Sequence, residues 1–223
     1  MSEGLRLNLG CGQRARQPGW LNCDLTASPN VDVAFDALKD WPFPDHSVQT
    51  VYASHLLEHL PDPRAFFRNM WRVLRPDGTV TLRTPYGGHE SAWVDIDHVR
   101  PWYPGSFAFL QPGYGASVHS LQHETWTTPY CVHQTSLRVA LPYCRWLRPR
   151  WRRRWLLPLI PLIPNSFNEL WVELYALKTP GTVAEFRRLR PGNAVPVRYV
   201  AYAHEWDPRA PAEPVTLVEI EGG

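Results

Sequence analysis

Three side chains of this chain are suited to moving a proton or orienting a substrate: His55, Asp97 and His98. His55 follows the apolar run 48–54, and the other two lie in the cluster 95–98. An imidazole changes charge near neutral pH, and a carboxylate can hold it or share its proton. We therefore predict a general base or a substrate-orienting group among these three. The alternatives are a hydrogen-bonded structural histidine at position 55 and a capped loop with an ion pair at 95–98.

A second group of residues is suited to binding a nucleotide-like ligand. An apolar run enters Gly10-Cys11-Gly12, and two glycines let the backbone turn tightly and approach a ligand closely. Asp24 ends the next apolar segment, where a carboxylate can accept hydrogen bonds from two ribose hydroxyls. Asp36 ends the third apolar segment. It is the second candidate carboxylate for binding the ligand. Alternatively, Asp36 is a helix N-cap or turn residue, since residues 37–39 could continue as a helical turn.

Alternating strands and a helix must position these groups. The pattern predicts strands near residues 5–9, 20–24, 31–35, 48–54 and 78–84, and a helix over about 62–75 whose apolar residues share one face. In open α/β sheets, ligands bind outside the carboxyl ends of the strands. We therefore expect the glycine turn, the two aspartates and His55 along that edge.

The connection between the first two predicted strands is short. Only residues 10–19 separate them, whereas a parallel crossover normally takes about a dozen residues or more, including a helix. We expect that helix to be shortened or absent. One flank of the ligand site would then be open, to be covered by the C-terminal region or by a second subunit of a homo-oligomer.

Further segments follow the glycine turn in a fixed order. They are Pro42-Phe43-Pro44-Asp45, Leu57-Glu58-His59 and Arg72-Val73-Leu74-Arg75-Pro76-Asp77-Gly78. Over roughly residues 5–86 this order resembles the class I S-adenosylmethionine (SAM) dependent methyltransferases of the type 11 group. The resemblance implies an α/β fold: a Rossmann-like class I methyltransferase sheet, mostly parallel with a final antiparallel strand at about 169–178, plus an irregular substrate cap.

The resemblance also implies a cofactor, SAM, with S-adenosyl-L-homocysteine as its product. The glycines would approach the methionine part, Asp24 would accept from the ribose and Asp36 from the adenine amino group. The family often has an acid where this chain has Asn8, whose amide can still hydrogen-bond the SAM amine or a water. The implied cofactor-binding residues are Asn8, Gly10, Cys11, Gly12, Asp24, Asp36, Ala37 and Ser54.

On this basis we expect a methyltransferase domain over 1–178, with residues 87–168 as the substrate cap within it, and a C-terminal extension over 179–223. An edge strand is expected at 195–202. The predicted function is transfer of the SAM methyl group to a small-molecule or carrier-linked metabolite. A non-catalytic SAM-binding or interaction protein is the alternative. A nucleic-acid methyltransferase and an NAD-dependent reductase are disfavoured, since their sequence signatures are missing.

Composition sets further bounds. A formal net charge of +2 gives no overall electrostatic footprint for nucleic acid. Four scattered cysteines favour reduced thiols in the cytoplasm. We predict no metal, because the candidate ligands lack tight spacing. Those candidates are Asp95, Asp97, His98, His119, His123 and His133. Six arginines interleaved with tryptophans in Arg145–Arg154 form either a solvated face or a contact with a membrane surface or another anionic partner.

Overall fold

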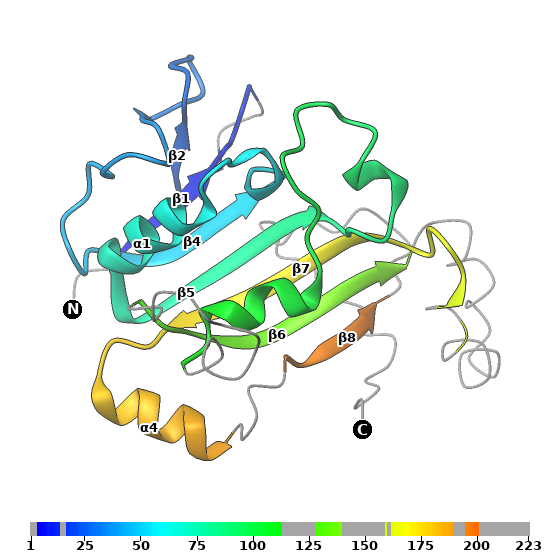
Figure 1. The fold of residues 1–223 in the computed structure, drawn as a ribbon. Helices are drawn as coiled ribbons and strands as arrows, with labels where there is room; N and C mark the ends of the chain where they lie inside the picture. Colours follow the sequence, from blue (N-terminus) through cyan, green and yellow to red (C-terminus); the bar gives the residue numbers. More distant parts are fainter. Residues whose placement is uncertain are drawn as a thin grey trace.

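Eight strands form one continuous sheet in the computed structural model, which describes residues 4–13, 17–112, 128–139, 159, 162–189 and 195–200 (Figure 1). The strand order across the sheet is β3-β2-β1-β4-β5-β7-β6-β8. The strands are β1 (Leu5–Leu9), β2 (Leu21–Asp24), β3 (Val33–Ala34), β4 (Val48–Ser54), β5 (Leu74–Pro85), β6 (Tyr130–Val139), β7 (Phe167–Ala176) and β8 (Val197–Val200).

The direction of the strands confirms the predicted fold class. Neighbours from β3 to β5 are parallel, whereas β7 is antiparallel to both β5 and β6. The sheet is therefore a mostly parallel Rossmann-like sheet with one antiparallel strand inserted next to β5. The five predicted N-terminal strands and the antiparallel strand are all present, with ends shifted by a few residues.

Helix α1 (Pro63–Val73) lies where the sequence predicted a helix over 62–75. Asp62 caps it by accepting a hydrogen bond from the Ala65 amide at 3.1 Å, and a proline occupies its first position. Its buried face carries Phe66, Phe67, Met70 and Val73. The helix ends earlier than predicted because Leu74 is already extended and begins β5.

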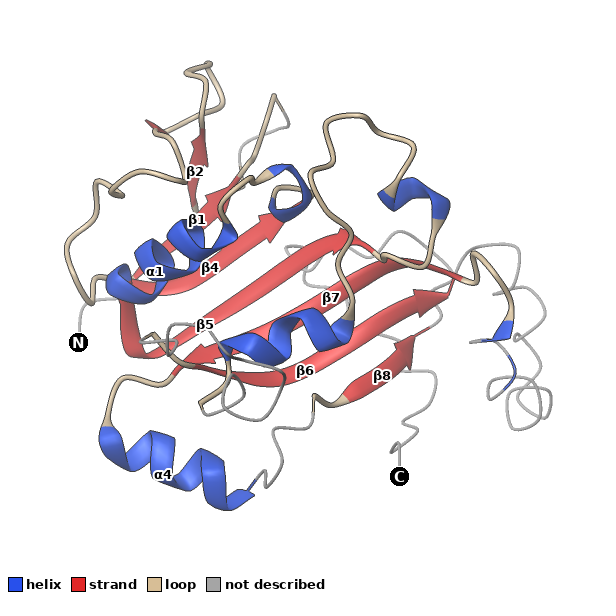
Figure 2. Ribbon diagram, in the orientation of Figure 1, coloured by secondary structure: helices blue, strands red, loops and turns tan. Residues whose placement is uncertain are grey.

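The core lies between one face of the sheet and two helical segments. Helix α1 and the 3₁₀ helix η3 (Pro104–Leu110) both pack on this face (Figure 2). Phe67 of α1 makes edge-on ring contacts with Phe107 of η3 and with Tyr130 of β6. The buried Tyr130 hydroxyl donates to the Phe67 carbonyl at 2.7 Å, and this hydrogen bond joins α1 to strand β6.

Part of the segment expected as a substrate cap belongs to the sheet instead. Residues 130–139 form β6, a strand that the sequence prediction missed, and η3 contributes the fully buried Phe107 to the core. Outside the sheet and η3, the segment 87–168 consists of the loop 87–103, which holds the 3₁₀ helix η2 (Glu90–Ala92), of short loop pieces, and of residues outside the described ranges. The cap therefore remains a proposal for those parts only.

The short connection after β1 has the expected form where it is described. Residues 10–13 and 17–20 form turns, not a helix. At the other end of the chain, helix α4 (Pro180–Leu189) leads towards β8, which pairs with β6 at the sheet edge, as predicted for 195–202. Within the described residues, no helix is long and apolar enough to cross a membrane.

Candidate functional site

The glycine turn follows β1 directly. Gly10 and Gly12 both have left-handed backbone conformations, with φ of +66° and +60°, which glycine adopts without steric cost. A Cβ at Gly10 would lie 3.2 Å from the Leu56 Cβ, whereas one at Gly12 would meet none of the described residues within 4 Å. The chain is thus tightly packed at Gly10 and borders open space at Gly12.

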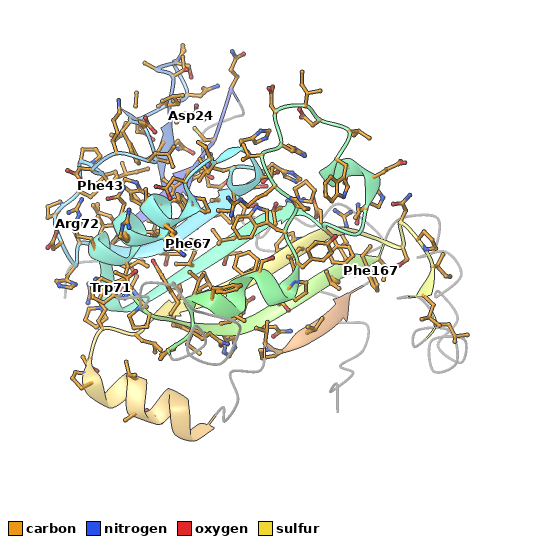
Figure 3. The ribbon with its side chains drawn as sticks, viewed as in Figure 1. Asp24, Phe43, Phe67, Trp71, Arg72 and Phe167 are labelled. Atoms are coloured by element: carbon orange, nitrogen blue, oxygen red, sulfur yellow. The ribbon has the colours of Figure 1, made fainter. Side chains whose placement is uncertain are left out.

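Asp24 closes this turn from the neighbouring strand. Its Oδ2 accepts a hydrogen bond of 2.7 Å from the Gly12 amide, and Figure 3 shows the residue at the tip of β2. The carboxylate is partly exposed, and its other oxygen makes only a long, 3.4 Å contact with the Thr26 amide. Asp24 therefore holds the turn in place and keeps acceptor capacity for a ligand beside Gly12.

The Asn8 side chain contacts the neighbouring strand β2, whereas the sequence suggested a hydrogen bond to the cofactor or to a water. Its side chain is buried, and its amide nitrogen donates to the Oδ1 of Asn22 on β2 at 2.9 Å. Asn22 is held in turn by Asp32, whose Oδ2 accepts from the Asn22 backbone amide at 2.8 Å. The Asn8 side chain thus links β1 to β2, and this bond uses one of the donors expected to face the cofactor.

Asp36 follows β3 at the same edge of the sheet. Its Oδ1 accepts from the Leu38 amide at 2.9 Å, and its Oδ2 lies 3.8 Å from the Lys39 ammonium. Residues 37–39 form a turn and not a helix. The carbonyl of Ala37 accepts from the Trp41 indole at 3.0 Å. The turn alternative for Asp36 is thus present in the structure, while its second oxygen stays partly exposed.

The two cysteines of this region are buried. Burial, with the Cys11 and Asp24 side chains nearby, raises the pKa of the Cys23 thiol to about 12. Burial and the charge of Asp24 also raise the pKa of Cys11. Both side chains are therefore neutral thiols at neutral pH, buried beside the glycine turn.

Ser54 and His55 end β4 at the carboxyl edge. The Ser54 hydroxyl is buried without a hydrogen-bond partner among the described residues. His55 has a left-handed φ of +54°, which is uncommon for a residue other than glycine and marks a strained position. A buried unpaired hydroxyl beside a strained residue is an arrangement that functional sites often contain.

Two carboxylates hold the His55 ring. Its Nδ1 lies 3.1 Å from the Oε1 of Glu58, and its Nε2 lies 3.2 Å from the Oε1 of Glu169. The hydrogen bonds to Glu169 and then to Glu58 outweigh the effect of burial and raise the pKa of His55 to about 9. At neutral pH the ring is therefore a cation with both nitrogens engaged.

Glu169 collects donors from three strands. It accepts from Arg83 of β5, from Arg138 of β6 at 3.2 Å and from the Trp171 indole at 3.1 Å, besides His55. Burial alone would raise the pKa of Glu169, but the His55 hydrogen bond and the Arg83 guanidinium hold it well below its usual range. Glu169 is an ionised, nearly buried carboxylate.

These contacts weaken the prediction that His55 is a general base. A doubly bonded imidazolium has no lone pair to accept a proton, so the structure favours the alternative, a hydrogen-bonded histidine that joins β4 to β7. The sequence analysis did not assign Glu169, Arg83 or Arg138 to the site. An acidic residue within the apolar segment 167–176 was the available signal for Glu169.

The cluster at 95–98 forms a loop over the 3₁₀ helix η1 (Leu57–His59). The Asp97 backbone pairs with its neighbours: its amide donates to Asp95 at 3.0 Å, and its carbonyl lies 3.2 Å from the His59 Nδ1. His98 Nε2 lies 3.7 Å from Asp95 and not beside Asp97. The expected alternative of a capped loop is thus present, with Asp95 close to His98, and Asp97 and His98 do not pair with each other.

Several predicted features cannot be placed. His119, His123 and Arg145–Arg154 lie outside the described residues. Of the placed site candidates, Gly10, Gly12, Asp24 and Cys11 come together at one corner. His55 lies at the end of β4 with Glu58, and Glu58 in turn adjoins His59 and His98.

Comparison with known proteins finds matches to the segment that contains this corner. Residues 11–82 match the family model described as a methyltransferase domain. A probable S-adenosylmethionine-dependent methyltransferase of Mycolicibacterium smegmatis is 40% identical over 57 residues, which cover 26% of this chain and 22% of that protein. An uncharacterized methyltransferase of Mycobacterium sp. strain KMS is 42% identical over 55 residues, or 22% of each protein. The matches thus span about a fifth of these curated relatives.

Solved structures of similar shape include the YcgJ protein of Bacillus subtilis, at 18% identity and a TM-score of 0.47, covering 80% of this chain and 93% of that one. A SAM-dependent methyltransferase of Archaeoglobus fulgidus is 14% identical with a TM-score of 0.46, covering 77% of this chain and 86% of that one. Residues 11–82, from the glycine turn to β5, thus match the methyltransferase domain model.

Proposed function

We propose that this protein is a SAM-dependent methyltransferase acting on a small molecule or a carrier-linked metabolite. The observation that carries the proposal is the corner formed by the glycine turn and Asp24, where the Gly12 amide donates to Asp24 at 2.7 Å within the segment that matches the family. The curated relatives that match this segment are named as methyltransferases. The chain shares only about a fifth of their length, so the activity is argued from its own residues.

The described residues fit such a cofactor. The space beside Gly12 is open to a ligand, and Asp24 offers a partly exposed carboxylate next to it. In the proposed mode Asp24 accepts from the ribose hydroxyls and Asp36 from the adenine amino group, with Ala37 beside it. The backbone of residues 8–12 approaches the methionine part. The unpartnered Ser54 hydroxyl is available to a ligand at the end of β4.

The chemistry supplied by bound SAM is a methyl group on a positively charged sulfur, ready for in-line displacement. The chain must then align the acceptor and exclude water, which can account for several kcal/mol of barrier lowering, up to roughly 7–11 kcal/mol in well-oriented intramolecular reactions. We assign His55 to this orienting task. Its ring is held by Glu58 and Glu169, so His55 provides a positive charge at a fixed position and does not accept a proton.

The loop 95–98 supplies the other candidate residues of the acceptor side. His98 and Asp97 are tied to η1 through the Val99 amide, which donates to the Glu58 carbonyl at 2.8 Å, and through the His59–Asp97 contact. The loop thus lies against the segment that follows His55. In the proposed function, this loop places Asp97 and His98 on the acceptor side.

A non-catalytic SAM-binding protein is the second candidate. The specific observations in its favour are the Asn8 side chain, which is bonded to Asn22, and the His55 ring, which is bonded on both sides. Such a protein would bind SAM at the glycine corner without transferring a methyl group.

Binding is tested by calorimetry with SAM and with S-adenosyl-L-homocysteine on the full chain. We expect one site, and we expect Asp24→Ala to weaken binding by about 1–3 kcal/mol, the cost of removing a charged hydrogen-bond partner. Asp40→Ala, at an exposed position outside the corner, serves as the matched control and should bind normally. A wild-type chain that binds neither compound at millimolar concentration would refute the proposal.

Turnover separates the two candidates. The protein is incubated with SAM carrying an isotopically labelled methyl group and with fractionated small-molecule extracts, and labelled products are sought by mass spectrometry. Label transfer that disappears in Asp24→Ala supports the enzyme. Tight SAM binding without label transfer to any fraction supports the non-catalytic alternative.

A further inference from the structure

The loop that carries His98 is fastened to η1 at two points. The Val99 amide donates to the Glu58 carbonyl at 2.8 Å, and the Asp97 carbonyl lies 3.2 Å from the His59 Nδ1. These contacts bring the His59 and His98 rings edge to face, with centroids 4.8 Å apart. Two histidines from distant parts of the sequence thus share one small volume beside Glu58.

Backbone carbonyls set the tautomer of both rings. His59 Nδ1 faces the Asp97 carbonyl at 3.2 Å, and His98 Nδ1 faces the Ala92 carbonyl at 3.3 Å. A carbonyl only accepts, so each Nδ1 carries the proton and each Nε2 keeps a lone pair. Metal-binding histidines characteristically donate their second ring N–H to a carbonyl or carboxylate in this way. Each ring thus keeps its Nε2 lone pair available to an ion.

Glu58 provides an independent observation. Its side chain is only 2% exposed, and its Oε1 is taken by His55. Its Oε2 is buried without any hydrogen-bond partner among the described residues. Leaving a buried carboxylate oxygen unpaired costs its lost hydration, so such an atom calls for a partner.

We propose that Glu58, His59 and His98 form a binding site for a divalent transition-metal ion of the zinc type. Their ligand atoms all lie within 4.8 Å of one another. Two imidazole nitrogens and one carboxylate oxygen are a donor set that zinc uses in proteins, at about 2.0–2.2 Å from each ligand. Ligand atoms around a tetrahedral ion lie about 3.3 Å apart, so modest side-chain rotations close the site.

Asp95 is within reach as a further ligand. Its Oδ2 lies 3.7 Å from the His98 Nε2, too far for a hydrogen bond, and its side chain is 47% exposed. The Asp97 amide holds the other carboxylate oxygen at 3.0 Å. The fourth position is therefore filled by Asp95 or by water. No cysteine is among the described ligand candidates of this cluster, so nitrogen and oxygen ligation distinguishes the site from the thiols at Cys11 and Cys23.

The site departs from the expectation of no metal, which was drawn from ligand spacing. The pattern around 95–98 indicated His98, but its partners Glu58 and His59 lie about forty positions earlier, in the Leu57-Glu58-His59 motif. The proposal does not depend on methyltransferase activity, because it concerns occupancy of a site beside His55 that can be measured without SAM or an acceptor.

The test uses the tag-free full-length chain, stripped with a chelator and titrated with Co²⁺ and with Zn²⁺ in competition with a chromophoric chelator. We expect one equivalent to bind, with a Co²⁺ spectrum that has d–d bands and no thiolate charge-transfer absorption. Losing one outer-shell partner typically weakens a metal site about 10–100-fold, so removing a ligand should cost at least that. The ligand variants are Glu58→Gln, His59→Gln and His98→Gln.

His133→Gln is the control, since His133 lies on β6 outside the cluster and should leave binding unchanged. Circular dichroism checks the fold of each variant, and His59→Gln, at an exposed position, carries the least structural risk. Failure of the wild-type chain to bind a stoichiometric ion overturns the proposal. So does a thiolate spectrum, or binding by folded His98→Gln and His59→Gln that equals that of His133→Gln.

Discussion

The Nε2 atom of His55 lies 3.2 Å from the Oε1 of Glu169, although the two residues are 114 positions apart in the chain. The contact joins the end of β4 to β7, and Arg83 of β5 reaches the same carboxylate oxygen. Three strands are therefore connected at the carboxyl edge of the sheet by one ionised side chain. This connection fixes His55 in its left-handed conformation beside the proposed acceptor site.

Replacing Glu169 with glutamine should strongly destabilise the protein at neutral pH. The side chain is 9% exposed and neutralises Arg83 and Arg138, so its loss leaves buried charges unpaired, at a cost of about 3 kcal/mol. The pKa of Glu169 is depressed in the folded state. Its stabilisation is therefore fully present above the unfolded value of about 4.3 and is lost as the pH falls below it. Urea unfolding at pH 7 and near pH 3 measures the difference.

The matched control is Glu173→Gln, an exposed glutamate on the same strand. It should unfold close to the wild type at both pH values. Equal stability of Glu169→Gln and Glu173→Gln at pH 7 would show that the carboxylate network contributes nothing to the fold.

Alanine at the two glycines of the turn should have different effects. Both residues have left-handed backbones, which cost an alanine about 1–2 kcal/mol. At Gly10 the added methyl also lies 3.2 Å from Leu56, whereas at Gly12 it enters open space. Gly10→Ala should therefore lower the melting temperature more, while Gly12→Ala should stay folded and lose SAM affinity, as measured by calorimetry. Undiminished SAM binding by Gly12→Ala would place the cofactor elsewhere.

Arg72 should stabilise the segment between β3 and β4. Its guanidinium donates to the carbonyls of Phe43 at 2.9 Å and Trp41 at 2.8 Å, and Figure 3 shows Arg72 next to Phe43 at the end of α1. Arg72→Met leaves these carbonyls unpaired and should cost about 2 kcal/mol of unfolding free energy. Arg68→Met, at an exposed position of the same helix, is the control and should unfold like the wild type. A similar loss in both variants would refute this role.

Cys23 should resist alkylation in the folded protein. It is 1% exposed, and with a pKa of about 12 only about one thiol in ten thousand is ionised at pH 8. Cys131 is only half-buried and should react first among the three described cysteines. Peptide mass spectrometry after timed iodoacetamide treatment measures the order, and a urea-unfolded sample, where all cysteines react, provides the reference. Early modification of Cys23 would contradict its buried, protonated state.

The N-terminal half of the fold was predictable because its signals are local. Gly10 and Gly12 need left-handed backbones, and Asp62 caps α1. The apolar residues of β1 and β4 follow the strand period, and those of α1 follow the helix period. These requirements act over a few residues and therefore appear in the sequence. The strand β6 was missed because Tyr130–Val139 carries histidine, glutamine, threonine and serine at positions whose burial depends on β7 and β8.

The sequence by itself determined the parallel strands β1 to β5, their carboxyl edge and the match to the methyltransferase domain model over residues 11–82, since residue order and periodicity encode strand succession and turn chemistry. Tertiary structure alone decided how the charged side chains pair. From the sequence alone His55 was predicted to be a base, but in the fold β7 places Glu169 beside its second ring nitrogen. His98 lies next to His59 and Glu58 because its loop is hydrogen-bonded to η1. Such pairings depend on distances of a few ångströms between distant segments, and the electrostatic energies that set pKa values change steeply over those distances.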